Sequence, residues 1–177
     1  IAKDSSVCVI GLGTIGLLLT MFLKSEGIEN VYVIGTKEMQ KKYVRELGVT
    51  EEYFNIEHIS ADYVFECVGK NETVNEAIEL AAPAGHIIMV GNPYSDMDIS
   101  KDLYWKILRK QLKISGTWNS SYMREVSDDW HYVLNKLERK EIVPERFITH
   151  EYSMDDIETG MKIMRDKTQE YVKIMCD

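Results

Sequence analysis

The chain has 177 residues, a formal net charge of −8 and an apolar fraction of 45%. The length suffices for one domain and part of a second, and the apolar fraction suffices for a full core. The acidic balance argues against a nucleic-acid-binding protein, which normally carries a basic face. The longest apolar run, Ile15 to Leu23, is too short to span a bilayer. We therefore expect a globular protein that binds neither nucleic acid nor membrane, with no signal peptide.

Three cysteines, Cys8, Cys67 and Cys176, lie far apart in strand-like runs and show no C-x-x-C spacing. We expect buried, reduced thiols in a cytoplasmic protein. Because the chain opens at Ile1, only a few residues before its first predicted strand, we also expect it to be part of a longer protein.

The first predicted element is a buried strand, Val7–Ile10, followed by the run G-L-G-T-I-G and an apolar helix, Leu17–Leu23. A G-x-G-x-x-G sequence that follows a strand and opens a helix is the setting in which this motif binds a nucleotide. A plain tight turn between a strand and a helix is the alternative interpretation.

Each residue of this turn has a role if a dinucleotide binds there. Gly11 permits the sharp turn, Gly13 leaves room for a pyrophosphate to approach the backbone, and Gly16 lets the helix pack on the strand. The amides of Thr14 and Ile15 then face an anion at the positive end of the helix dipole.

Strands and helices alternate from there to Gly116. The predicted strands are Val31–Ile34, Tyr53–Phe54, Asp62–Gly69, His86–Gly91 and Leu112–Gly116, with a small extra strand at Met97–Ile99. The predicted helices are Glu38–Leu47, Asn71–Ala82 and Lys101–Arg109. This alternation predicts an α/β protein: a doubly wound parallel sheet of the Rossmann type, with strand order 3-2-1-4-5-6.

The connection from the third to the fourth predicted strand is unusually short. Only about seven residues, Asn55 to Ala61, are available, and they reach roughly 24 Å when extended. That length barely covers the distance between the two strands. We expect the third strand to be short and its crossover helix to be missing.

From Thr117 onward the pattern changes to a C-terminal αβαβ segment. The expected elements are a helix over Asp128–Arg139, a strand over Ile148–Tyr152, a helix ending near Arg165 and a strand over Tyr171–Cys176. Ser153 and Asp156 form a capping-box pattern at the start of the second helix. We therefore divide the chain into a Rossmann domain, residues 1–116, and a C-terminal segment, residues 117–177.

Few residues suggest chemistry outside the glycine turn. Glu66 lies inside a predicted buried strand, and we interpret it as a strand-end residue with its own hydrogen-bond partners rather than as a cofactor contact. Asp128 and Asp129 fit a helix start. The four histidines are scattered without metal-ligand spacing, and we expect His86 to lie at the surface. We expect no catalytic residue and no metal site in this chain.

Five stretches occur here in a specific order: G-L-G-T-I-G, F-E-C-V-G, A-G-H-I-I-M-V-G, L-K-I-S-G-T-W and F-I-T-H-E-Y-S-M-D-D-I-E-T-G-M. Together they resemble the medium-chain dehydrogenase/reductase superfamily, and within it the zinc-type polyol dehydrogenases of the sorbitol and galactitol-1-phosphate type. The resemblance covers essentially the whole chain. It implies hydride transfer between a secondary alcohol, such as a polyol or sugar phosphate, and NAD(P), in a homodimer or homotetramer.

In that family a preceding GroES-like domain carries the catalytic zinc, and the resemblance implies that residues 117–177 pack on it. It also implies cofactor contacts. Gly11, Gly13, Thr14 and Ile15 hold the pyrophosphate, Val68 and Gly69 wall the adenosine and ribose, and Val90, Gly91, Asn92, Ser115 and Gly116 flank the nicotinamide. Lys173 stands where the family often has a basic residue near the pyrophosphate. A solvated charge on a strand is the alternative for Lys173.

The end of the second strand predicts a preference for NADP over NAD. NAD-binding turns place an acidic residue there, bonded to the ribose 2′-hydroxyl, whereas this chain has Gly35. Thr36 can donate a hydrogen bond to a 2′-phosphate, and Lys37 supplies a positive charge. The alternative is that Gly35 is only a turn residue and Lys37 is solvated.

Other functions remain open at this point. A methyltransferase that binds S-adenosylmethionine would need an acidic residue at the position of Gly35. A zinc-free NADPH-dependent reductase and a non-catalytic dinucleotide-binding module both fit the glycine turn. Asp96–Ser100 lies outside the six predicted strands, and the family resemblance implies that such a segment pairs across a two-fold axis.

Overall fold

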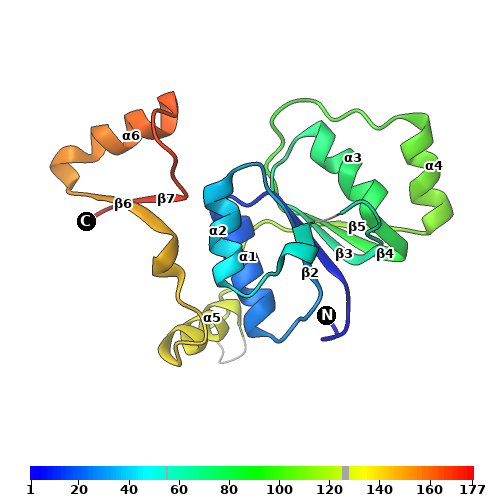
Figure 1. Cartoon of the computed structure of the whole chain (residues 1–177), viewed down its shortest axis with the longest axis horizontal. Helices are drawn as coiled ribbons and strands as arrows, with labels where there is room; N and C mark the ends of the chain where they lie inside the picture. Colours follow the sequence, from blue (N-terminus) through cyan, green and yellow to red (C-terminus); the bar gives the residue numbers. More distant parts are fainter. Residues whose placement is uncertain (55, 125–127) are drawn as a thin grey trace.

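The computed structural model describes residues 1–54, 56–124 and 128–177, and its core is a parallel sheet with helices on both faces (Figure 1). The strands are β1 (Val7–Ile10), β2 (Val31–Ile34), β3 (Ala61–Glu66), β4 (Ala81–Met89), β5 (Lys113–Gly116), β6 (Ile148–Tyr152) and β7 (Lys173–Cys176). The α-helices are α1 (Thr14–Ser25), α2 (Glu38–Glu46), α3 (Asn71–Leu80), α4 (Lys101–Lys110), α5 (Asp129–Glu138) and α6 (Ile157–Asp166). Short 3-10 helices are η1 (Glu51–Phe54), η2 (Pro144–Phe147) and η3 (Met154–Asp156).

Five strands form the main sheet in the order β2-β1-β3-β4-β5, and all neighbouring pairs are parallel. β1 lies inside this sheet and its four residues are fully buried. Val9 of β1 lies opposite Val33 on one side and Phe65 on the other. A continuous apolar run buried on both faces is typical of such a strand. The predicted Rossmann-like α/β fold is confirmed.

Alternate side chains of β1 enter two separate hydrophobic cores, because successive side chains of a strand point to opposite faces. Val9 packs in one core with Leu17 of α1 and Val44 of α2. Ile10 packs in the other core with Ile78 of α3, and side chains of α4 pack against that cluster. Helices α1 and α2 therefore cover one face of the sheet, and α3 and α4 cover the other.

The third predicted strand is wrong. Tyr53 and Phe54 belong to η1, which packs beside β2. The Tyr53 hydroxyl donates to Asn30 Oδ1 at 3.1 Å, and its ring meets Tyr32 of β2 edge to face, with centroids 5.0 Å apart. In the 3-10 turn both aromatic side chains are half-buried and pack against the core that contains Val9. The observed strand order is therefore the predicted order without its third strand. Asn55, where the predicted connection begins, lies outside the described residues.

Other local predictions also need correction. Met97–Ile99 forms no strand, because the amide of Asp98 is bonded to the Asn71 side chain at 3.0 Å and Met97 packs on the second core. The capping box is not formed either. The amide of Asp156 donates to the Ser153 carbonyl, and this tight turn brings the Ser153 hydroxyl to the Asp156 carboxylate, 3.1 Å away.

The C-terminal segment has the predicted αβαβ order, and its two strands form a separate parallel pair, β6-β7. This segment lies along the side of the molecule that carries α1 and α2 (Figure 1). Ile142, Phe147 and Val172 are buried in the same core as Val9 and Leu17. The segment is thus anchored in the core beneath α1.

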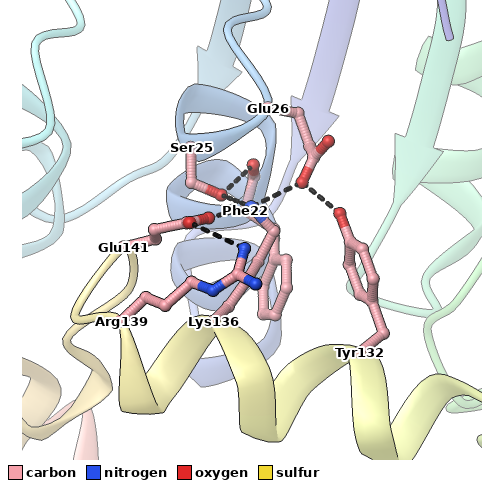
Figure 2. A network of polar contacts seen from close by, with 7 residues as sticks. All are labelled: Phe22, Ser25, Glu26, Tyr132, Lys136, Arg139 and Glu141. Carbon is pink, nitrogen blue, oxygen red and sulfur yellow. Dashed lines mark hydrogen bonds and ion pairs between the residues drawn. The ribbon is translucent and has the colours of Figure 1, made fainter. Parts of the chain in front are cut away.

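A buried lysine fastens α5 to the end of α1 (Figure 2). Lys136 is only 8% exposed, and its Nζ lies 2.7 Å from Glu26 and 2.9 Å from Glu141. Ser25 Oγ lies 3.3 Å from the same nitrogen, and the Tyr132 hydroxyl donates to Glu26. The hydrogen bond between Lys136 and Glu26 raises the pKa of the lysine and lowers the pKa of the carboxyl. Both groups are therefore charged at neutral pH.

Among the described residues, no helix combines the length and the apolar character needed to cross a membrane. The three cysteines are unpaired.

Candidate functional site

The glycine turn has the geometry that the sequence predicts. Gly11 has φ of +93°, a left-handed conformation that favours glycine, and its amide donates to Ile34 of β2 at 2.8 Å. A Cβ at Gly16 would overlap the carbonyl oxygen of Gly11. The turn is therefore closed tightly against the ends of β1 and β2, and a larger residue at Gly16 would push α1 away from the sheet.

Gly13 differs from its neighbours because a Cβ on it would meet nothing within 4 Å. The residue caps α1 in an extended conformation, and no side chain bonds the cap. The first amides of a helix have no acceptor within the helix, so those of Thr14 and Ile15 point out of its N-terminus. Open space, free amides and the positive end of the dipole together suit a phosphate group.

The turn after β3 lies beside the glycine turn. A Cβ at Gly11 would overlap Val68, and a Cβ at Gly69, which has φ of +82°, would overlap the carbonyl oxygen of Asn92. A Cβ at Gly91 would overlap the amide of Gly69. β1 continues to β2 on one side, whereas β3, β4 and β5 extend to the other. These residues therefore meet at the point where the strand order reverses, the usual ligand site of doubly wound sheets.

Glu66 organises both turns beyond β3 and β4. One oxygen of its fully buried carboxylate accepts from the amides of Val68 and Gly69 and from the Thr73 hydroxyl, each at 2.8 Å. Its backbone carbonyl accepts from the amides of Val90 and Gly91, at 2.8 and 2.9 Å. The prediction that Glu66 has hydrogen-bond partners of its own is confirmed. The bonds satisfy one oxygen of the carboxylate, whereas the other, Oε2, is buried without a hydrogen-bond partner in the described part of the chain.

Ser115 and Gly116 end β5, opposite Ile88 and Met89 of β4. Ser115 Oγ lies 2.7 Å from Nε2 of His86, a half-buried residue of β4 opposite Lys113 of β5. A Cβ at Gly116 would meet nothing within 4 Å. The structure thus aligns the ends of β4 and β5, where the predicted nicotinamide contacts lie.

The end of β2 holds the predicted 2′-phosphate contacts. Thr36 is exposed, and Lys37 precedes α2 without an ion-pair partner within 4 Å in the described part of the chain. Glu38 is engaged elsewhere, because its carboxylate lies 3.0 Å from Lys41, and this hydrogen bond lowers its pKa. A Cβ at Gly35 would lie 2.6 Å from Leu12 Cδ1, so packing against that leucine also favours glycine there.

Lys173 is brought to the glycine turn by the C-terminal segment. It lines a cavity of about 380 Å³ together with Thr14, Ile15 and Glu145. The Thr14 hydroxyl donates to the carbonyl of Val172, the residue before this lysine, at 2.7 Å. Residue spacing does not predict this contact, since 158 positions separate its two residues.

The charged and nucleophilic groups elsewhere are accounted for by structural roles. Asp128 caps α5 by accepting from the His131 amide at 2.9 Å, and this bond holds the pKa of Asp128 at about 2. Burial raises the pKa of Cys8 and of Cys67 to about 12, so both thiols are protonated at neutral pH. Protonated thiols are weak nucleophiles and weak metal ligands.

The strand order defines this chain as a Rossmann-like α/β protein. The N-terminus of α1 lies where the strand order reverses, and the open space at Gly13 suits an anion there. Residues 14–139 match the family described as zinc-binding dehydrogenase. The chain therefore belongs to the zinc-binding dehydrogenase family, as its motifs indicated. In the described residues, no three His, Cys, Asp or Glu side chains are grouped to hold a metal ion, so these residues do not fit a zinc site.

Curated relatives include two kinds of dehydrogenase. Galactitol 1-phosphate 5-dehydrogenase of Escherichia coli K12 is 24% identical over 173 residues, which cover 90% of this chain and 50% of that protein. L-threonine 3-dehydrogenase of Escherichia fergusonii is 30% identical over 172 residues, covering 90% of this chain and 48% of that protein. This chain thus spans about half the length of the relatives it matches.

Solved structures share the fold. Galactitol-1-phosphate dehydrogenase from Escherichia coli superposes with a TM-score of 0.81 at 19% identity, over 96% of this chain and 53% of that one. A protein described as a zinc-binding dehydrogenase from Sinorhizobium meliloti, bound to NADP, gives 0.78 at 21% identity, over 97% and 52%. An alcohol dehydrogenase from Escherichia coli CFT073, complexed with NADH, gives 0.81 at 20% identity, over 98% and 52%.

Proposed function

We propose that this chain is the cofactor-binding part of a zinc-type alcohol or polyol dehydrogenase, which transfers hydride between a secondary alcohol and NAD(P). The observation that carries the proposal is the open position of Gly13 at the switch point, in front of the free amides of α1. Membership of the dehydrogenase family supports it. A bound nicotinamide dinucleotide supplies the hydride chemistry, and the residues of this chain bind and orient it.

In this proposal the diphosphate lies against Gly11, Gly13 and the amides of Thr14 and Ile15, with the Lys173 charge close by. Val68 and Gly69 wall the adenosine and its ribose. The nicotinamide lies along the ends of β4 and β5, beside the residues Val90, Gly91, Asn92, Ser115 and Gly116. The tight packing of Gly69 against Asn92 supports this arrangement, because it fixes the two walls relative to each other.

We further propose that NADP is preferred to NAD. Gly35 places no carboxylate near the ribose, Thr36 and Lys37 are available to a 2′-phosphate, and Glu38 is held by Lys41. A charge-assisted hydrogen bond contributes on the order of 1.5–3 kcal/mol, so the preference is about tenfold or more. Gly35→Asp is expected to reverse it. Gly35→Ala is the matched control, because it introduces the same Cβ beside Leu12 without the charge.

The substrate of the whole enzyme is proposed to be a small polyol or sugar phosphate, by analogy with the galactitol 1-phosphate relative. Catalytic zinc is proposed to come from a further, GroES-like domain of a longer protein, on which residues 117–177 pack beside the 1–116 domain. We also propose a homodimer or homotetramer, with no nucleic-acid or membrane partner. Three unpaired cysteines support a cytoplasmic location.

The test is a titration of the 177-residue chain with NADPH and NADH, followed by an alcohol assay. We expect saturable binding of both dinucleotides, tighter for NADPH, and no turnover of sorbitol or galactitol 1-phosphate with added zinc. Failure to bind either dinucleotide contradicts the proposal. Turnover at roughly 1 s⁻¹ or more, an ordinary enzymatic rate, contradicts the expectation that this chain alone is inactive.

The alternatives are a zinc-free NADPH-dependent reductase and a non-catalytic dinucleotide-binding module. The absence of a grouped metal-ligand set in the described residues is compatible with both. The upstream sequence of the parent gene separates them, since cysteine, histidine and glutamate zinc ligands there indicate the zinc enzyme.

A further inference from the structure

The residue that immediately precedes strand β7, Val172, is bonded directly to the start of α1. The Thr14 hydroxyl, in the first turn of that helix, donates to the carbonyl of Val172 at 2.7 Å. Val172 is 5% exposed, and its side chain belongs to the core beneath α1. Both its side chain and its carbonyl therefore tie the beginning of β7 to the Rossmann core.

The same stretch of backbone is fixed from its other side by β6. The amide of Val172 donates to the Thr149 hydroxyl oxygen at 3.2 Å, and that hydroxyl donates to the carbonyl of Lys173 at 3.0 Å. The two threonine hydroxyls thus bond three backbone polar groups of Val172 and Lys173. Among the hydrogen bonds of the described residues, the Thr14 bond is the one that joins this stretch to the start of α1.

These bonds determine where the Lys173 side chain lies. Successive side chains of a strand point to opposite faces, so a buried Val172 directs Lys173 away from the core. Lys173 is exposed and lines the cavity of about 380 Å³ that Thr14 and Ile15 also line. In the described part of the chain it has no ion-pair partner within 4 Å, although Glu145 lies along the same cavity. Its charge is available to an anion at the helix start.

We propose that Thr14 is a positioning residue, whose hydroxyl holds β7 so that Lys173 faces the diphosphate bound at the glycine turn. Thr14 then acts on the ligand in two ways, through its backbone amide and through the lysine that its side chain places. The inference rests on the proposed dinucleotide site. It adds that the Thr14 hydroxyl, by holding the chain at β7, sets the position of the Lys173 charge in that site.

A double-mutant cycle on the 177-residue chain tests this, with the NADPH dissociation constant as the readout. Lys173→Ala removes the charge and is expected to weaken NADPH binding about tenfold. Thr14→Val removes only the hydroxyl and is expected to weaken binding by a large part of that factor. The double variant is expected to bind within about twofold of Lys173→Ala alone, because the hydroxyl acts through the lysine. Thr14→Ser retains the bond and should restore wild-type affinity.

Two controls separate positioning from a general loss of structure. Thr20→Val removes another hydroxyl from α1, one that is fully buried and donates to Gly16 at 2.8 Å, and it should leave NADPH affinity unchanged. Adenosine, which lacks the diphosphate, should bind Thr14→Val and wild type equally well in an NMR titration. The inference is overturned if the losses of NADPH affinity in Thr14→Val and Lys173→Ala multiply in the double variant. It is also overturned if Thr14→Val weakens adenosine binding as much as NADPH binding. Either result leaves the proposed dinucleotide site intact. If wild type binds no NADPH, both the inference and the proposed function fall.

Discussion

Replacing Lys136 with methionine is expected to loosen the C-terminal segment from α1. Methionine keeps most of the apolar stem and removes the charge that Glu26 and Glu141 share (Figure 2). Removing one member of a buried ion pair costs about 3–5 kcal/mol. Here the two glutamates are 46% and 41% exposed and regain hydration. We therefore expect the free energy of unfolding to fall by a smaller amount, about 1–2 kcal/mol.

The assay is urea unfolding followed by circular dichroism, with Lys162→Met as the matched control. Lys162 pairs with Glu158 one helical turn away at 3.0 Å, and the two side chains are 55% and 79% exposed. An exposed pair of this kind contributes about 0.5 kcal/mol or less. If Lys136→Met lowers the free energy of unfolding no more than Lys162→Met does, the claim that the buried Lys136 contacts stabilise the protein more than an exposed ion pair is refuted.

Acidification provides a second check on the same contacts. Because the hydrogen bond from Lys136 lowers the folded-state pKa of Glu26, its contribution to stability is present above the ordinary value of 4.5. The contribution is lost as the pH falls through the lowered folded-state value. The stability difference between wild type and Lys136→Met should therefore shrink below pH 4.5. A difference that grows on acidification would contradict this assignment.

Three further predictions concern the site and its surroundings. Lys37→Met should weaken NADPH binding about tenfold and leave NADH binding unchanged, whereas Lys42→Met should change neither; equal losses for both cofactors would count against a 2′-phosphate contact. Glu66→Leu leaves the amides of Val68 and Gly69 without their acceptor, and should lower the free energy of unfolding by about 2–4 kcal/mol. Glu66→Gln keeps an acceptor and should lose clearly less in the same urea experiment. Ile99→Pro should weaken self-association measured by light scattering, and a wild type that is monomeric at high micromolar concentration argues against the proposed dimer.

The sequence predicted those elements whose conformation is determined by residues close together in the chain. The glycine turn combines a buried β-branched strand, three glycines and an apolar helix, so its outcome depends little on distant contacts. Tyr53–Phe54 shows the opposite case. Two apolar residues next to each other fit a short strand as well as a 3-10 turn, and the contact with Tyr32 of β2 selects the turn.

The contacts that complete the candidate site are long-range, and residue spacing does not reveal them. At the site, Thr14 meets Val172 across 158 positions. At the other end of α1, Lys136 of α5 meets Glu26 in an equally long-range contact. The role of Glu66 was partly predictable, because a carboxylate inside a buried strand needs hydrogen-bond partners. Which groups those partners are depends on the turn that follows β3, and that turn is defined only by the three-dimensional packing of Gly69 and Gly91.

The most direct test of the central claim is NADPH binding by Gly13→Val. A Cβ added at Gly13 would meet nothing in the protein within 4 Å, and the residue has an ordinary φ of −71°. The variant should therefore fold, with a stability loss of about 1 kcal/mol from the poorer helix cap. The added side chain would occupy the space assigned to the diphosphate. We predict that calorimetric titration shows NADPH binding weakened at least tenfold by Gly13→Val at nearly unchanged thermal stability. A folded Gly13→Val chain that binds NADPH as tightly as wild type would contradict the account.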